Sequence, residues 1–184
     1  MTTFEQLPST LPVFPLRGVV LLPGEDLPLQ IFEPRYLEMF NDALRTDRLL
    51  GIIQPKEASV CSGDKTTLLH DLGCAGRITS FTETDDGRQM VTLRGISRFR
   101  IKTEVETPRP YRLVQPLWKE FAHDFQEEER IGLDRSRLNA LLESYFELQG
   151  LYCDWDAVQS APSHKLITLL SMVCPLDPEE KQAL

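Results

Sequence analysis

The residues that could do nucleophilic or metal chemistry are few and scattered. The four cysteines and three histidines include no C-x-x-C pair and no zinc-ligand spacing, so no metal site is expected. Two cysteine–histidine pairs are close in sequence, Cys61 with His70 and Cys153 with His164. Catalysis needs a thiolate held against an imidazole in space, and a sequence does not show proximity. Chance accounts for such pairings, so reduced, buried thiols are the expectation.

Two other patterns look reactive at first sight. Ser163-His164-Lys165 places a hydroxyl beside an imidazole, but adjacent helical residues point about 100° apart and cannot act as a nucleophile–base pair. This stretch is expected to open a helix. Carboxylates gather in Glu127-Glu128-Glu129 and Asp85-Asp86, whereas a catalytic pair needs desolvated and differently tuned surroundings. These runs predict a solvated linker and a turn, so no catalytic residue is assigned.

The motifs that bind common cofactors are absent. No glycine precedes a lysine, which excludes G-x-x-x-x-G-K-[ST] and hydrolysis of ATP by a P-loop. No G-x-G-x-x-G follows a strand pattern, and G-x-S-x-G is missing. The sequence therefore predicts a protein that is not an enzyme and needs no cofactor.

The overall charge narrows the choice of partners. The 184 residues carry a formal net charge of −8, and an acidic domain repels phosphate backbones. Residues 1–10 lack the basic and apolar regions of a signal peptide, and no apolar run is long enough to span a membrane. The expectation is a cytoplasmic protein without nucleic-acid or membrane partners.

The first part of the chain, residues 1–118, reads as short strands with one inserted helix. Prolines interrupt the apolar run 11–22, so its strands should be short, bulged or at an edge. The pattern predicts an α+β protein whose strands form a small, closed or half-closed antiparallel β-barrel. The expected strands are 27–32, 49–53, 75–81, 90–101 and 111–118, with a polar loop over 54–67 and a hairpin turn at 85–87.

The second part, residues 119–184, is rich in helical patterns. An acidic linker precedes an apolar stripe over 138–146, and Gly150 is placed to stop that helix. A second stripe covers 166–173. Asp177-Pro178-Glu179-Glu180 combines an N-cap, a proline at the first helical position and a glutamate at the third. This last helix has barely begun at Leu184, so either the native chain continues or the helix is unusually short.

The stretch Glu33-Pro34-Arg35-Tyr36 joins the strand 27–32 to the inserted helix. Pro34 suits a first helical turn, and Glu33 is placed as a cap or a partner of the helix dipole. In the structural interpretation, Arg35 pairs with a nearby carboxylate or carbonyl and Tyr36 buries its ring. The alternative interpretation makes these residues a ligand-binding patch.

Several motifs along the chain resemble the Lon N-terminal domain, the substrate-binding module of ATP-dependent Lon proteases. The opening LPVFPLRGVVLLPGEDLPLQIFEPRY (11–36) matches its L-P-[LV]-[FL]-P-L segment, its V-x-[LF]-P-G turn and its I-F-E-P-R-Y signature. GCAGRI (73–78) and GRQMVTLRGISRFRI (87–101) resemble its middle strands, and PLDPEEKQAL (175–184) resembles its closing helix. The likeness spans nearly the whole chain.

This resemblance implies a PUA-like β-barrel over 1–118 and a helical bundle over 119–184. It also implies a stand-alone recognition domain without ATPase or protease modules. The implied function is that of an adaptor or holdase for unfolded or tagged polypeptides, with an ATP-dependent protease as a further partner. Exposed aromatic and aliphatic side chains would contact the client. The candidate peptide-binding residues are Phe32, Arg35, Tyr36, Phe99 and Trp118.

Two alternative functions are kept. PUA-like barrels also bind RNA, which would need a basic face here. The residues that could form it are Arg94, Arg98, Arg100 and Lys102. The other alternative is a small-molecule site, which would be a deep polar cleft with perturbed titratable groups.

Overall fold

The computed structural model describes residues 4–56, 67–126 and 134–184. The chain forms two compact units. The first comprises Met1–Gln126 together with Pro175–Leu184, and the second comprises Glu127–Cys174. The closing segment thus belongs to the strand-rich unit, whereas the sequence analysis had assigned all of 119–184 to one helical subdomain.

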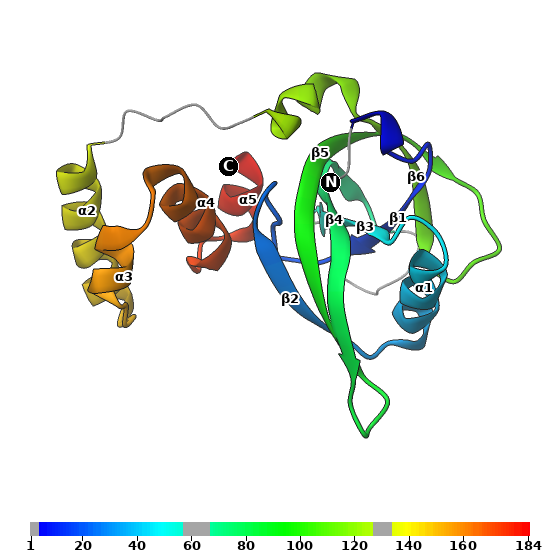
Figure 1. The fold of residues 1–184 in the computed structure, drawn as a ribbon, viewed down its shortest axis with the longest axis horizontal. Helices are drawn as coiled ribbons and strands as arrows, with labels where there is room; N and C mark the ends of the chain where they lie inside the picture. Colours follow the sequence, from blue (N-terminus) through cyan, green and yellow to red (C-terminus); the bar gives the residue numbers. More distant parts are fainter. Residues whose placement is uncertain (1–3, 57–66, 127–133) are drawn as a thin grey trace. The chain divides into compact units, whose positions relative to one another are not determined.

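The first unit contains the six strands found in the described part of the chain, and Figure 1 shows their arrangement. A short 3₁₀ helix opens the described chain, and a longer 3₁₀ segment follows the last strand. The elements are η1 (Phe4–Gln6), β1 (Leu11–Pro15), β2 (Asp26–Ile31), α1 (Pro34–Leu44), β3 (Leu49–Pro55), β4 (Leu69–Glu83), β5 (Gln89–Val105), β6 (Arg112–Leu117), η3 (Lys119–Phe125) and α5 (Pro178–Ala183).

The strands form one mixed sheet in the order β2-β5-β4-β3-β1-β6, and β5 also pairs with β6. The prediction of a purely antiparallel sheet is wrong at one pair, because β1 and β3 run parallel. A parallel pair needs a crossover connection, and β2 and α1 lie in the chain between these two strands. The pairings of β5, β4, β3, β1 and β6 return to β5, so these five strands form a ring, and β2 lies outside it.

The core of the first unit lies inside this ring. Phe99 is fully buried at its centre, and Gly73 leaves it room, since a Cβ on Gly73 would lie 2.9 Å from the Phe99 ring. Trp118 packs edge-on against Phe99 with 5.7 Å between ring centroids. Alternation along the strands places apolar side chains inward. The buried cluster consists of Leu11, Val13, Leu49, Ile53, Ala75, Phe99 and Val114.

A buried glutamine fastens the closing segment to the sheet. Gln54 was expected in a polar loop, but it lies in β3 and is 2% exposed. Its Oε1 accepts a hydrogen bond from Gly18 N at 2.8 Å, and its Nε2 donates to Pro178 O at 2.9 Å. A buried amide must satisfy its polar atoms, and these partners come from distant parts of the chain. The rest of the predicted loop, 57–66, lies outside the described residues.

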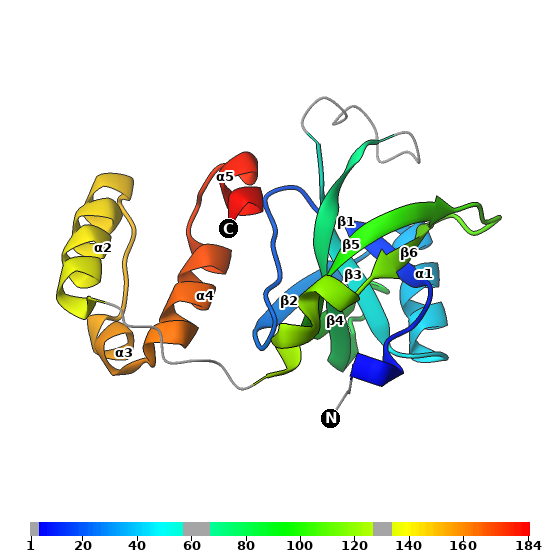
Figure 2. The ribbon, with the colours of Figure 1, turned by 90° about the horizontal axis from the view of Figure 1, so that it is seen from above.

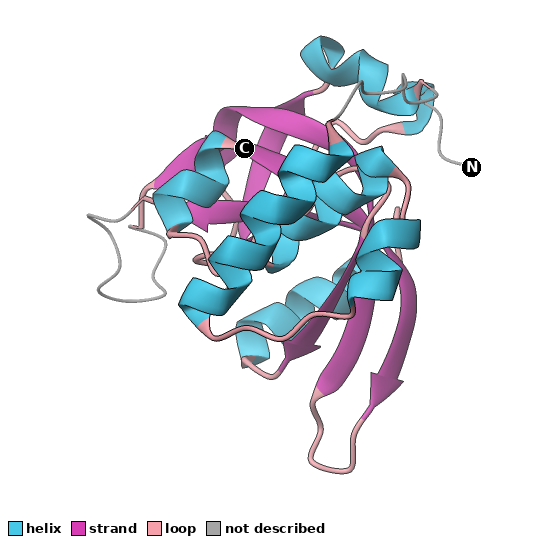
Figure 3. Cartoon of the chain, turned by 90° about the vertical axis from the view of Figure 1, so that its left-hand side faces the viewer, coloured by secondary structure: helices cyan, strands magenta, loops and turns pink. Residues whose placement is uncertain are grey.

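The second unit consists of three helices, α2 (Arg135–Gln149), α3 (Trp155–Ser160) and α4 (Ser163–Val173). They are seen from above in Figure 2 and coloured cyan in Figure 3. Leu142, Val158 and Leu166, one from each helix, form a small buried cluster. Gly150 ends α2 with φ 64°, as predicted. The acidic linker 127–133 lies outside the described residues.

Candidate functional site

The joint between β2 and α1 has the local structure that the sequence predicts. Pro34 occupies the first turn of α1, and Glu33 is the N-cap residue. The Glu33 side chain makes no capping hydrogen bond. Its Oε2 instead pairs with Arg35 Nη2 at 2.7 Å. The Arg35 guanidinium also lies 4.5 Å from the centroid of the Tyr36 ring. Arg35 is therefore held between a carboxylate and an aromatic ring.

Tyr36 is a core residue. Its side chain is buried, and its ring lies against Phe14 with 4.2 Å between centroids. Burial raises the pKa of the Tyr36 hydroxyl, although the positive charge of Arg35 opposes this rise. A ring held in this way stabilises the seam between β1 and α1 and offers no surface to a client.

The five candidate peptide-binding residues are separated by the structure. Phe99 and Tyr36 are buried, and Trp118 is half-buried with Nε1 donating to Pro8 O at 2.9 Å. Phe99 and Tyr36 therefore act as packing residues rather than surface contacts, because the ring of strands and α1 cover them. Phe32, by contrast, is 60% exposed. Arg35 lies three residues beyond it and keeps part of its side chain in solvent.

Two exposed apolar residues that the sequence analysis missed lie at the same end of the sheet as Phe32. Met90 pairs with Gln30 of β2 and with Thr82 of β4. Phe81 lies next to Thr82 in β4 and therefore points to the opposite face of the sheet from Met90. It is half exposed, and its ring centroid lies 5.4 Å from that of Phe40 of α1. We call Phe32 and Met90 the hairpin patch, because Met90 is opposite Gln30, two residues before Phe32, near the base of the β4–β5 hairpin that projects beyond β2 in Figure 1.

The two residues differ in what the sequence could show. Met90 alternates with Thr92 and Arg94, on the face opposite to the buried Val91 and Leu93, so its exposure follows the strand pattern. Phe81 instead pairs with the buried Val91, and nothing in the sequence marks it as exposed. Arg88 places its guanidinium 5.9 Å from the Phe32 ring and borders the patch with positive charge.

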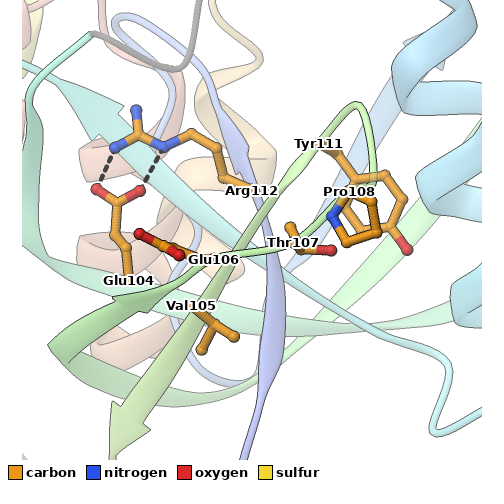
Figure 4. Close-up of a pocket in the computed structure, with 7 residues that line it drawn as sticks. All are labelled: Glu104, Val105, Glu106, Thr107, Pro108, Tyr111 and Arg112. Carbon is orange, nitrogen blue, oxygen red and sulfur yellow. Dashed lines mark hydrogen bonds and ion pairs between the residues drawn. The ribbon is translucent and has the colours of Figure 1, made fainter.

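An open hollow of about 590 Å³ lies along the turn between β5 and β6. Figure 4 shows the Arg112 guanidinium facing Glu104, with Tyr111 and Pro108 away from that pair. Arg112 also donates to Thr67 O, so its charge is already satisfied. The hollow is lined by Glu104, Val105, Glu106, Thr107, Pro108, Tyr111 and Arg112.

Among the residues that line this hollow, Tyr111 has a strongly raised pKa, and its hydroxyl is hydrogen-bonded to α1. The Tyr111 hydroxyl donates to Asp42 Oδ2 at 2.8 Å. Burial and the Asp42 carboxylate raise the pKa of Tyr111 to about 12. The hydroxyl therefore stays protonated and joins the turn to α1. The arrangement is suited to holding structure, and it lacks the convergent reactive groups of a catalytic or small-molecule site.

Three arginines of β5, which the sequence analysis named as a possible RNA-binding face, form ion pairs with carboxylates. Arg94 lies 3.2 Å from Asp26, and Arg98 lies 2.6 Å from Asp124 of η3. Arg100 pairs with both Asp71 and Glu120. Lys102 is exposed. Paired guanidinium groups do not form the positive stripe that phosphate backbones require, so RNA binding is not favoured.

The three cysteines that the structure describes, Cys74, Cys153 and Cys174, give no sign of reactivity or metal binding. Cys74 is buried, and burial raises the pKa of its thiol far above the ordinary value. Within residues 4–56, 67–126 and 134–184, no three histidine, cysteine or acidic side chains gather in a metal-binding cluster. Cys61, and with it the pairing with His70, lies outside the described residues. No helix of the described chain has the length and apolarity to cross a membrane.

Known proteins match this chain in sequence. Lon protease 2 of Myxococcus xanthus is 26% identical over 181 residues, which cover 97% of this chain and 22% of that protein. The Lon protease of Flavobacterium johnsoniae is 31% identical over 144 residues, which cover 78% of this chain and 16% of that protein. This chain thus spans only a small part of the length of these relatives.

Solved structures match it in fold, and a family model matches it in sequence. The Lon N-terminal domain protein from Xanthomonas campestris superposes with a TM-score of 0.65 at 23% identity, over 96% of this chain and 89% of that one. The N-terminal domain of a Mycobacterium avium complex Lon protease gives 0.61 at 16% identity, over 95% and 88%. The model of the ATP-dependent protease La (LON) substrate-binding domain matches residues 10–184. The chain therefore belongs to the LON substrate-binding domain family.

Proposed function

We propose that this chain is a non-catalytic polypeptide-recognition module that acts as an adaptor or holdase for unfolded or tagged proteins. Membership of the substrate-binding family supports substrate recognition. The structural observation that carries the proposal is the hairpin patch, in which Phe32 is 60% exposed and Met90 is 44% exposed. Exposed apolar side chains grouped in this way are typical of interaction sites.

The first unit serves as a rigid support for this patch. In the proposal, its ring of strands is the small PUA-like barrel that the resemblance implies. Phe32 directly follows the last residue of β2, and Met90 lies opposite Gln30 on β5, so strand pairing fixes their spacing. A client segment that becomes ordered on binding loses conformational entropy, so the affinity of a single site is expected to be weak.

The cellular setting is part of the same proposal. The relatives named Lon protease support an ATP-dependent protease as the partner that receives the client. We place the protein in the cytoplasm, where such a partner would meet unfolded chains. The Glu33–Arg35 pair lies beside Phe32 and is suited to contact polar groups that flank an apolar client segment.

Titration of fluorescein-labelled β-casein, an unfolded protein, tests the proposal through its fluorescence anisotropy. The wild-type chain should bind it, and Phe32→Ser should weaken binding about tenfold because burial of the ring is lost. Leu117→Ser is the matched control. Leu117 is 43% exposed but pairs with Arg100, far along β5 from the patch.

Two results would contradict the proposal. One is the absence of saturable binding by the wild-type chain to β-casein and to its peptides. The other is equal weakening by Phe32→Ser and Leu117→Ser, which would mean that binding does not depend on the hairpin patch. A folded protein used as competitor should not displace the labelled β-casein.

A further inference from the structure

The strand β2 has one free edge. Each strand of the ring pairs with two other strands of the ring, and β5 pairs with β2 as well, whereas β2 pairs with β5 alone among the described residues. Figure 1 shows β2 beside β5 at the margin of the sheet. An unpaired strand edge presents N–H and C=O groups that can bond to another extended chain.

The direction of these groups follows from the register. Glu25 O accepts a hydrogen bond from Gly95 N of β5 at 2.8 Å, so the carbonyl of residue 25 faces β5, while its N–H donates to Leu22 O. The pairing continues without a register shift from Asp26 to Ile31. In an antiparallel pair, alternate residues face the partner strand. Asp26, Pro28 and Gln30 therefore turn their backbone groups to the free edge.

Pro28 makes this edge asymmetric. It keeps a carbonyl but has no N–H to donate, so three acceptors at the edge are matched by two donors, from Asp26 and Gln30. A proline in an edge strand opposes pairing between identical edges. A second copy of this chain would present the same deficit, whereas an unrelated chain with complete amide groups can donate to all three carbonyls.

One apolar side chain lies next to the edge. Phe32 follows directly after the last residue of β2 and is 60% exposed. Met90 is opposite Gln30 on β5, so β2 separates it from the free edge. A strand added to β2 would run beside the end of β2 that Phe32 follows. Backbone bonds to the edge and side-chain contacts with the patch are the two components of recognition by strand addition.

We propose that the free edge of β2 takes an extended segment of the unfolded client as an added strand, with an apolar side chain of that segment against Phe32. This inference rests on the proposed function and specifies how the client is held. It requires no sequence motif in the client beyond an extended, proline-free apolar segment. Affinity would come from the client backbone as well as from its side chains.

Backbone esters in the client test this directly. The probe is the shortest β-casein peptide that retains binding, synthesised as a series in which one amide at a time becomes an ester. Each ester removes one N–H donor. Esters at every second position should weaken binding about fivefold, and those between them should have little effect.

Variants of the edge give a second measurement with opposite expected signs. Pro28→Thr restores a donor and should tighten binding of the same peptide about threefold. Gln30→Pro removes a donor and should weaken it, whereas Gln30→Thr keeps the N–H and controls for loss of the side chain. Unfolding followed by Trp118 fluorescence shows whether each variant keeps its fold.

The outcomes separate this inference from the proposed function. Binding that depends on Phe32 but is equally insensitive to esters at all positions would overturn strand addition and leave the proposed function standing. Tighter binding by Gln30→Pro would also overturn it. If no β-casein peptide binds the wild-type chain, the proposed function fails and this inference fails with it.

Discussion

The two units of this chain are built on different principles. The core of the first unit collects residues from five strands that are distant in sequence, and Leu11, Phe99 and Val114 are all fully buried. The core of the second unit consists of Leu142, Val158 and Leu166 on consecutive helices, with exposures of 3% to 9%. Several large apolar side chains of its helices and loops remain exposed, among them Leu148, Tyr152 and Val173.

This difference bears on folding as well as on function. A ring of strands closes only when distant segments meet, so its hydrogen bonds and core form together. Short helices with a shallow core open at low free-energy cost and can do so locally. We therefore expect the first unit to unfold as a cooperative block and the second to unfold earlier and separately.

Each unit contains one of the two tryptophans. Trp118 packs on Phe99 in the first unit. Trp155 packs on Phe146 in the second, at 5.8 Å between centroids. Single-tryptophan backgrounds made with Trp155→Phe or Trp118→Phe thus report on one unit at a time during unfolding in urea.

The largest expected effect comes from the centre of the ring. Phe99→Ala should lower the free energy of unfolding of the first unit by about 4 kcal/mol, because it leaves a cavity where Gly73 and Gly51 provide no side chain to fill it. Urea unfolding followed by Trp118 should show this loss. A parallel shift of the Trp155 transition would mean that the units unfold as one.

The second unit should respond independently. Leu166→Ala removes one of its three buried residues and should cost about 3 kcal/mol. Trp155 should then report a second unit that is largely unfolded without denaturant, while the Trp118 midpoint stays near its original value. A Trp118 midpoint that falls by a similar amount would refute the independence of the two units.

Gln54→Ala tests to which unit the closing helix belongs. The change leaves Gly18 N and Pro178 O without their side-chain partner and should destabilise the first unit by about 2 kcal/mol. The Trp118 transition should move and the Trp155 transition should not. Gln115→Ala, at an exposed glutamine of β6, is the control and should change neither.

The smallest effect at neutral pH concerns Tyr111. Its pKa is raised from 10.0 to about 12 in the folded state, so the unfolded chain loses this proton first. The stabilisation is therefore complete below pH 10 and disappears as the pH rises to about 12. Tyr111→Phe should lose about 1 kcal/mol at neutral pH through the bond to Asp42.

The pH dependence provides the measurement. Urea midpoints read from Trp118 should fall less steeply between pH 10 and 12 in Tyr111→Phe than in the wild-type chain. The difference between the two proteins isolates Tyr111 from other titrating groups. Equal slopes would show that this hydroxyl does not stabilise the first unit through its protonated form.

Features fixed by short-range chemistry were predictable from the sequence. Pro34 begins α1, and Gly87 has φ 78° in the β4–β5 turn. Asp177 and Glu180 form the capping box of α5, and Gly150 stops α2. Each depends on a proline ring, a missing Cβ or a side chain that reaches its own backbone, so neighbouring residues suffice to predict it.

Features fixed by distant partners were not predictable. The apolar pattern of β1 and β3 says nothing about direction, so the parallel pair was missed. Gln54 was assigned to a loop because its amide is polar, and the groups that satisfy it, on Gly18, Pro178 and Gln182, are far from it in the sequence. The exposure of Phe32 in the hairpin patch could not be predicted from the sequence either. Phe32 and Phe99 have the same side chain, and only the position of the ring of strands places one in solvent and the other in the core.

The bond between Gln54 and Pro178 has one more consequence. It joins α5 to the same body that holds η3 through Asp124, so the second unit is a segment attached at both ends. Because both of its ends are attached to the first unit, such a segment forms a closed loop and cannot move away as a free tail would.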